Sequence, residues 1–143
     1  MEKPLNAVVS ASDTPTNLKQ IVDDLISSSL ACALHNKSKV VNEIDKGIVF
    51  GPANEAVVGI LNELLTTVIE NSRNGDIHIT ADRFQDIVAV QIQERNNYNG
   101  YALSYSIGSI EPEAISLGGH IAIKGPQKRI TTISFCFPDQ VAA

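Results

Sequence analysis

The stretch Asn54–Asn71, which reads NEAVVGILNELLTTVIEN, decides the fold class that the sequence predicts. A stripe on it contains Glu63 and Thr67, which are neighbours on a helix because they lie four residues apart. Beside this stripe, apolar residues recur at the spacing of one helix face, in the pairs Ala56 and Val57, Ile60 and Leu61, Leu64 and Leu65, and Val68 and Ile69. We therefore expect an amphipathic helix with a carboxylate and a hydroxyl at the edge of the core, a suitable place for a nucleotide or metal site.

Length and charge limit the class of protein. The 143 residues predict a single domain, 1–143, because a chain of this size buries roughly two thirds of its unfolded surface in one core. The net charge of −5 argues against nucleic acid as the main partner, and no apolar run is long enough for a membrane span. Cys32 and Cys136 lie in apolar segments, and we expect buried free thiols in a reducing cytoplasm rather than a disulfide.

The N-terminal part predicts one long helix. A short apolar piece, Leu5–Val9, is a candidate edge strand. Thr14 or Thr16 can then cap a helix by accepting a backbone N–H. The helical period continues from about Asn17 to His35.

Short segments with period-two alternation or with turn residues at both ends predict the strands. They are Val40–Ile44, Ile48–Phe50, Ile77–Ala81, Ile87–Gln93, His120–Lys124 and Ile130–Phe137. The last two flank a GPQK turn, which indicates a hairpin. Within Ile87–Gln93, the alternation of Val88, Val90 and Ile92 continues to Glu94, which places Glu94 at the strand end on the buried face.

The order of these elements predicts the fold class. A short helix is expected around Ser109–Leu117, with Pro112 in its first turn, whereas the preceding RNNYNGYALSYSIGSIEP has no clean period. Helices, strand pairs, a short helix and a closing hairpin indicate an α+β fold. We expect a two-layer α/β sandwich with one mixed, mostly antiparallel sheet covered by helices on one face.

Three stretches resemble the ATP-binding catalytic domain of sensor histidine kinases, which belongs to the GHKL family. ILNELLTTVIENSRNGDIHI is similar to the asparagine-box helix and the strand after it, and IVAVQIQERNNYNG to the strand that leads to the first glycine box. ISLGGHIAIKGPQKRITTISFCFP is similar to the closing strand pair. The resemblance covers about Asn17 to Pro138 and implies the Bergerat-type ATP-binding fold.

The resemblance also implies roles for two residues of the asparagine box. The family's first polar position, which orients or activates water or a substrate group, falls on Glu63, and a carboxylate there is competent as a base. The family's magnesium-binding asparagine falls on Thr67. A threonine hydroxyl can bind Mg²⁺ but is shorter than an asparagine side chain.

The nucleotide-binding positions that the resemblance implies follow in the chain. The family's adenine-binding aspartate falls on Glu94. The glycines of the box, which let the backbone approach the nucleotide, fall on Asn96 and Tyr98. The family's mobile lid is missing, and Gly100 begins a remnant of the second glycine cluster. In the final motif a glycine has become Ile130, while the threonines Thr131 and Thr132 remain.

Three tyrosines follow Glu94: Tyr98 at the last position of the first glycine box, and Tyr101 and Tyr105 in the segment after the box. Their rings can stack on a nucleotide base. We favour a second interpretation, in which they fold over a vacated pocket and plug it.

These departures predict a domain in two-component-type signalling with a degraded nucleotide site, acting through contacts with another signalling protein, such as a sensor or response-regulator chain. The resemblance implies ATP and Mg²⁺ as cofactors, and the degraded site implies that neither is bound. The alternative is an enzyme, a divergent ATP-binding kinase or ATPase of the sensor histidine kinase or anti-sigma-factor-kinase type. In that case Glu63, Thr67 and Glu94 replace the usual residues.

Overall fold

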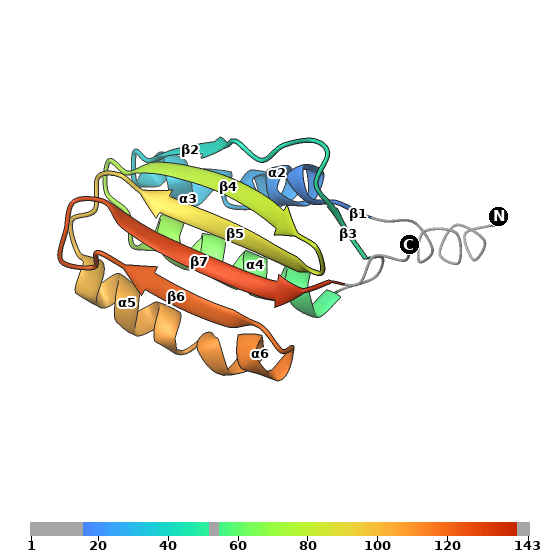
Figure 1. Cartoon of the computed structure of the whole chain (residues 1–143). Helices are drawn as coiled ribbons and strands as arrows, with labels where there is room; N and C mark the ends of the chain where they lie inside the picture. Colours follow the sequence, from blue (N-terminus) through green and yellow to red (C-terminus); the bar gives the residue numbers. More distant parts are fainter. Residues whose placement is uncertain (1–15, 52–54, 140–143) are drawn as a thin grey trace.

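A mixed sheet forms one layer of the protein, and helices cover one of its faces (Figure 1). The structure is a computed structural model and describes residues 16–51 and 55–139. The sheet order is β2-β4-β5-β7-β6, where β2 and β4 are parallel and every other pair is antiparallel. The strands are β2 (Lys39–Asn42), β4 (Asp76–Phe84), β5 (Ile87–Glu94), β6 (His120–Lys124) and β7 (Thr131–Pro138). The predicted α+β sandwich is confirmed.

The helices and a small second sheet complete the described part of the chain. The second sheet pairs β1 (Thr16–Asn17) with β3 (Val49–Phe50) in antiparallel fashion. The helices are α2 (Leu18–Ser28), α3 (Leu30–His35), α4 (Glu55–Glu70), α5 (Gly100–Gly108) and α6 (Glu111–Ser116). None of these helices is long and apolar enough to cross a membrane.

The helix that the sequence predicted most clearly, α4, supplies the largest share of the core that any helix contributes. Its buried residues are Val57, Ile60, Leu61, Leu64, Leu65, Val68 and Ile69. Every apolar pair therefore faces the sheet, except that Ala56 is exposed at the first turn. Buried residues of the strands pack against this face, among them Ile77, Val90, Ile92, Ile133 and Phe135.

The predicted helix from Asn17 to His35 is two helices. The chain leaves helical geometry at Ser29, where φ is −104° and ψ is 9°. Just before the break, Ser28 Oγ donates to the carbonyl of Asp24 at 3.2 Å, a side-chain bond that competes with the helical ladder. The cap is Asn17, whose Oδ1 accepts the backbone N–H of Gln20 at 3.0 Å, so the prediction of Thr16 as the cap is wrong. Thr14 and Leu5–Val9 lie outside the described residues.

Helix α5 was not predicted, because its buried residues are few. They are Gly100, Leu103 and Ile107, whereas Tyr101 and Tyr105 project from the opposite side. Asn99 begins the helix, since its Oδ1 accepts the backbone N–H of Ala102 at 3.4 Å. The next helix, α6, has Pro112 in its first turn, as the sequence predicted.

The register of the sheet confirms the predicted position of Glu94. Residues of β5 alternate in burial, and Glu94 lies on the covered face with only 3% of its surface exposed. Its Cα partners are Ile77 on β4 and Thr131 on β7. The β6–β7 hairpin is also confirmed, and Cys32 and Cys136 are free thiols that are half-buried rather than fully buried.

A pair of leucine substitutions tests how far α4 supports the core. Leu64→Ala removes a side chain with no exposed surface, and we expect the free energy of unfolding to fall by about 2–5 kcal/mol. Leu34→Ala, on an α3 side chain that is 67% exposed, should change it by less than about 0.5 kcal/mol. Urea unfolding followed by circular dichroism measures both values. Equal losses would contradict the central packing role of α4.

Candidate functional site

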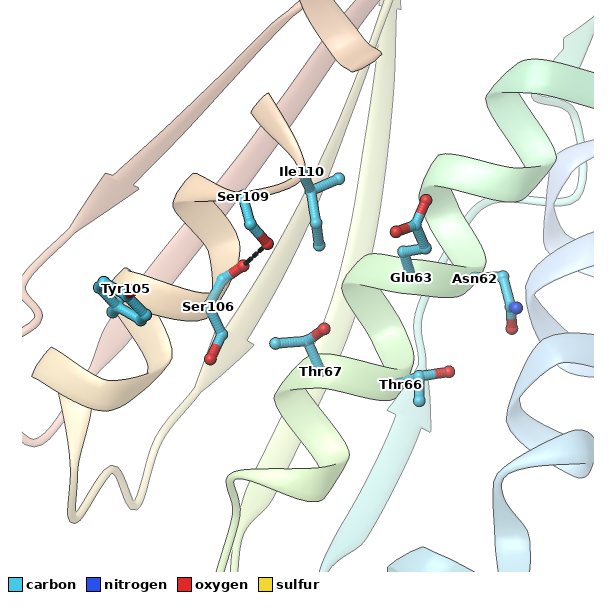
Figure 2. Close-up of a pocket in the computed structure, with 8 residues that line it drawn as sticks. All are labelled: Asn62, Glu63, Thr66, Thr67, Tyr105, Ser106, Ser109 and Ile110. Carbon is cyan, nitrogen blue, oxygen red and sulfur yellow. Dashed lines mark hydrogen bonds between the residues drawn. The ribbon is translucent and has the colours of Figure 1, made fainter. Parts of the chain in front are cut away.

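A cleft of about 400 Å³ lies between α4 and the α5–α6 segment, and it contains Glu63 and Thr67. The remaining residues that line it are Asn62, Thr66, Tyr105, Ser106, Ser109 and Ile110. Figure 2 shows Glu63 and Thr67 pointing from α4 toward the α5–α6 segment, whereas Asn62 points away from it. The predicted neighbourhood of a carboxylate and a hydroxyl at the edge of the core is therefore present.

The side of the cleft that faces α4 is polar but carries no positive charge. Ser109 Oγ donates to the carbonyl of Ser106 at 2.8 Å, so this hydroxyl is used within its own helical turn. No Lys or Arg is among the residues that line the cleft. Toward the α5–α6 segment, α4 therefore offers a ligand the carboxylate of Glu63 and the hydroxyl of Thr67.

Glu63 shares its surroundings with a second carboxylate, Glu113 of α6. Desolvation by burial raises the pKa of Glu63, and the negative charge of Glu113 and a side-chain hydrogen bond to it raise this pKa further. Burial and the neighbouring Glu113 therefore both make the ionised form of Glu63 less favourable than it is for a free glutamate. Glu113 was not predicted as a site residue, because the sequence gives no sign that α6 packs beside α4.

Glu94 is not among the residues that line this cleft, and its carboxylate binds the backbone of its own chain. Oε1 accepts the N–H of Asp76 at 2.8 Å and the N–H of Asn96 at 2.9 Å. Oε2 has no hydrogen-bond partner and is enclosed beside Gly75. A Cβ at Gly75 would collide with Oε2 and would lie 2.9 Å from the Cβ of Ser72. The buried carboxylate of Glu94 therefore links the start of β4 to the loop that follows β5.

The loop after β5 is held by hydrogen bonds to the segments beside it. Asn96 Nδ2 donates to the carbonyl of Asn74 at 2.8 Å. Asn97 N–H donates to the carbonyl of Arg129 at 2.8 Å, and Asn97 Nδ2 donates to that of Lys128 at 2.9 Å. Asn97 was not predicted as a site residue, although an Asn-rich loop is a usual source of such bonds.

Gly100 lies against the turn between β6 and β7. A Cβ at this position would collide with the carbonyl oxygen of Pro126. The glycine therefore allows the first turn of α5 to approach the hairpin backbone closely. Tyr98, two residues earlier, is 58% exposed.

The two threonines of the final motif face opposite sides of the sheet. Thr131 has no exposed surface, and its Oγ1 donates to the carbonyl of Gly125 at 2.9 Å. Thr132 is half-buried on the face that the helices do not cover, with Gln93 and Lys124 as its Cα partners. Thr131 is thus near Glu94, whereas Thr132 is separated from it by the sheet.

The structure consequently separates the predicted site residues into groups. Glu63 and Thr67 share the cleft, whereas Glu94, Asn96 and Thr131 gather at the end of the sheet. The tyrosine plug is wrong: Tyr98, Tyr101 and Tyr105 are 58%, 70% and 87% exposed. The side chains of α5 that are buried instead are Leu103 and Ile107.

Metal ligands are sparse in the parts of the chain that the structure describes. There, no group of three or more His, Cys, Asp and Glu side chains is placed to hold a metal ion. Thr67 lies beside the single carboxylate Glu63 in the lining of the cleft. Its carbonyl oxygen accepts the backbone N–H and the side-chain Nδ2 of Asn71, at 3.1 and 2.8 Å.

Comparison with known proteins identifies the fold. No family model and no curated protein sequence matches the chain. Among solved structures, the histidine kinase AdeS of Acinetobacter baumannii has a TM-score of 0.70 at 12% identity, covering 90% of this chain and 68% of that one. The nucleotide-free catalytic domain of histidine kinase ThkA has a TM-score of 0.67 at 15% identity, covering 88% and 95%. Full-length ShkA in complex with AMPPNP has a TM-score of 0.72 at 10% identity, covering 91% and 32%. The chain therefore has the histidine kinase-like ATPase fold.

Removal of one charge tests the carboxyl pair. A raised pKa for Glu63 stabilises the folded state below its ordinary value of 4.5, and this stabilisation is lost as pH rises through the folded pKa. Glu113→Gln removes the repulsion, so we expect a lower pKa of Glu63 and a smaller loss of stability toward neutral pH. Carbon-13 NMR of the Glu63 carboxyl and urea unfolding across this pH range measure the two effects. Glu111→Gln, on the same helix, is the matched control, and an equal shift there would contradict a specific pair.

Two glycine substitutions test whether Gly100 is held by the hairpin. Gly100→Ala should lower the free energy of unfolding by about 1–3 kcal/mol, since its Cβ collides with the Pro126 carbonyl. Gly59→Ala, on α4 with no atom within 4 Å of the added Cβ, should raise it by about 0.5–1 kcal/mol. Thermal and urea unfolding give both signs. A stabilising Gly100→Ala would mean that the turn is free to move away.

Proposed function

We propose that this chain is a histidine kinase-like ATPase-fold domain of two-component-type signalling whose nucleotide site is degraded and which acts through protein contacts. The observation that carries the proposal is the state of Glu94, at the position where the family binds adenine. Glu94 is 3% exposed, and one oxygen of its carboxylate already accepts two backbone N–H groups. Part of the proposal is a cytoplasmic location, which suits the two free thiols.

The surroundings of Glu94 support this proposal. An adenine acceptor must present an oxygen to the amino group of the base. The free Oε2 is instead enclosed beside Gly75 and Ser72. A base can reach it only if the loop before β4 moves and exposes a carboxylate that now holds two N–H groups of the chain.

The backbone around Gly100 supports it further. In the family, glycines here let the backbone approach the nucleotide. In this chain the carbonyl of Pro126 occupies the space beside Gly100. Asn97 also holds the loop against the hairpin, because it donates hydrogen bonds to the carbonyls of residues 126, 128 and 129. Only residues 95–99 separate β5 from α5, so this connection is too short to form a lid.

Electrostatics in the cleft also oppose a nucleotide triphosphate. Desolvation and the nearby negative charge of Glu113 raise the pKa of Glu63, and no Lys or Arg lines the cleft. Triphosphate would meet like charge without a compensating cation of the protein. Magnesium could compensate in principle, but Thr67 replaces the amide ligand that the family uses.

The class of partner is proposed by analogy with a protein of the same fold. Histidine kinase ThkA has been solved in complex with the response regulator protein TrrA, and this chain superposes on that kinase with a TM-score of 0.63. We infer that this chain likewise contacts another signalling protein, either a sensor chain or a response regulator.

A second candidate function is a divergent ATP-binding kinase or ATPase. The observation that favours it is the cleft of about 400 Å³, which leaves space beside Glu63 and Thr67. In this case Glu63 acts as the base that activates water or a substrate group, and Thr67 contacts the metal.

Isothermal titration calorimetry with ATP, with and without Mg²⁺, separates the two functions. The degraded site predicts no measurable heat of binding up to about 1 mM nucleotide, which corresponds to a binding free energy weaker than about −4 kcal/mol. Binding in the micromolar range would contradict the proposal and favour the enzyme.

Substitution of Glu94 distinguishes a structural carboxylate from an adenine acceptor. Glu94→Ala should lower the free energy of unfolding by about 2 kcal/mol or more, since two buried N–H groups lose their acceptor. Glu94→Gln keeps one oxygen acceptor and should cost less. If ATP binds to the wild-type chain and Glu94→Gln abolishes that binding without loss of stability, the carboxylate is a nucleotide ligand.

A further inference from the structure

Four segments lie next to one another at one end of the sheet (left in Figure 1). They are the turn 36–38, the loop 71–75, the loop 95–99 and the turn 125–130. Asn74 N–H donates to the carbonyl of Asn36 at 2.9 Å, and Asn96 Nδ2 donates to that of Asn74 at 2.8 Å. Asn97 N–H donates to the carbonyl of Arg129 at 2.8 Å, so hydrogen bonds connect the four segments one after another, from the turn before β2 to the β6–β7 hairpin.

Most of the positive charge of the chain lies at this end, although the chain as a whole has a net charge of −5. Seven of the eleven Lys and Arg residues are exposed there, and we call this surface the basic end: Lys37, Lys39, Arg73, Arg95, Lys124, Lys128 and Arg129. Three carboxylates accompany them, Glu70, Asp76 and Glu94. Glu94 is buried, and Asp76 already pairs with Lys39 and His78.

The cations nearest the hairpin have no partner of opposite charge. Among the described residues, Lys124, Lys128 and Arg129 form no ion pair. Like charges held together raise the free energy of the unbound protein, and an acidic partner removes that cost. The charge at the basic end is therefore available for binding.

Aromatic side chains stand beside these cations. Tyr98 and Tyr101 are 58% and 70% exposed, and they line a hollow of about 340 Å³ together with Lys128 and Arg129. Exposed Tyr and Arg at a concave surface are typical of protein interfaces, because both combine apolar contact with hydrogen bonding. The hollow suits an apolar residue flanked by carboxylates.

We propose that the basic end is the docking surface for an acidic segment of a partner protein. The inference rests on the proposed function, since it gives the chemistry of the partner through which the domain acts. A short acidic segment fits better than a nucleic acid, because the rest of the chain carries the negative charge. A long polyanion that continued past the basic end would meet that negative surface.

Fluorescence anisotropy with a labelled peptide tests the inference on the full chain. The probe is a fluorescein peptide of about twelve residues, rich in Asp and Glu with one central Leu, which is long enough to cross the hollow. We expect saturable binding that weakens about fivefold or more between roughly 50 and 200 mM NaCl, since exposed charges are screened. Absence of binding at the lower salt concentration would overturn the inference.

Matched charge reversals locate the surface. Lys128→Glu should weaken binding of the peptide about five- to tenfold, whereas Lys46→Glu should weaken it less than about twofold. Both residues are exposed, and both reversals change the net charge equally. Lys46 belongs to the segment between β2 and β3, and this segment lies at the end of the sheet opposite the basic end (Figure 1). Equal weakening by the two variants would show a general charge effect and overturn the inference.

Other occupants and the fate of the proposed function are separated by independent measurements. Tighter binding to anionic vesicles or to duplex DNA than to the peptide, or self-association at low salt in sedimentation, would replace the acidic partner segment and overturn the inference. Nucleotide binding in calorimetry would overturn the proposed function, while the contrast between Lys128→Glu and Lys46→Glu would still support the basic end. Loss of that contrast without nucleotide binding overturns the inference alone.

Discussion

The packing of α4 on the sheet is the constraint on which the rest of the structure depends. Seven apolar residues of this helix are buried, and the strands present matching buried residues on one face. This contact fixes the rotation of α4 about its axis. It thereby places Glu63 and Thr67 on the side that faces α5 and α6, and it directs the chain into β4 beside Glu94.

At the end of the sheet where α4 ends, polar side chains form hydrogen bonds with the backbone groups of the connecting loops. Asn36, Asn96 and Asn97 each bind a backbone carbonyl of another segment, and Glu94 binds two backbone N–H groups. A ligand that bound this end through the backbone would need N–H and carbonyl groups that are free to contact it. Here the backbone groups are satisfied by the chain itself, which is why the fold and the proposed loss of nucleotide binding are compatible.

Negative and positive side chains are found at different places on the protein. The cleft beside α4 is lined by the carboxylate of Glu63, which lies near Glu113, and by no cation, whereas seven Lys and Arg residues are exposed on the surface formed by the loops and the hairpin. A surface with unpaired cations and exposed tyrosines is suited to contacts with another macromolecule, and an acidic cleft is poorly suited to phosphate.

The sequence by itself determined the elements whose residues have a regular period: α4, the strand that ends at Glu94, the closing hairpin and hence the α+β class. Local patterns suffice there because burial imposes the period. Tertiary structure decided the rest. The break at Ser29 and the helix at Gly100 depend on contacts distant in sequence, and so does the approach of Glu113 to Glu63. The backbone partners of Glu94 and the exposure of the tyrosines were likewise set by loops that meet only in the folded chain, because no local period records which segments become neighbours.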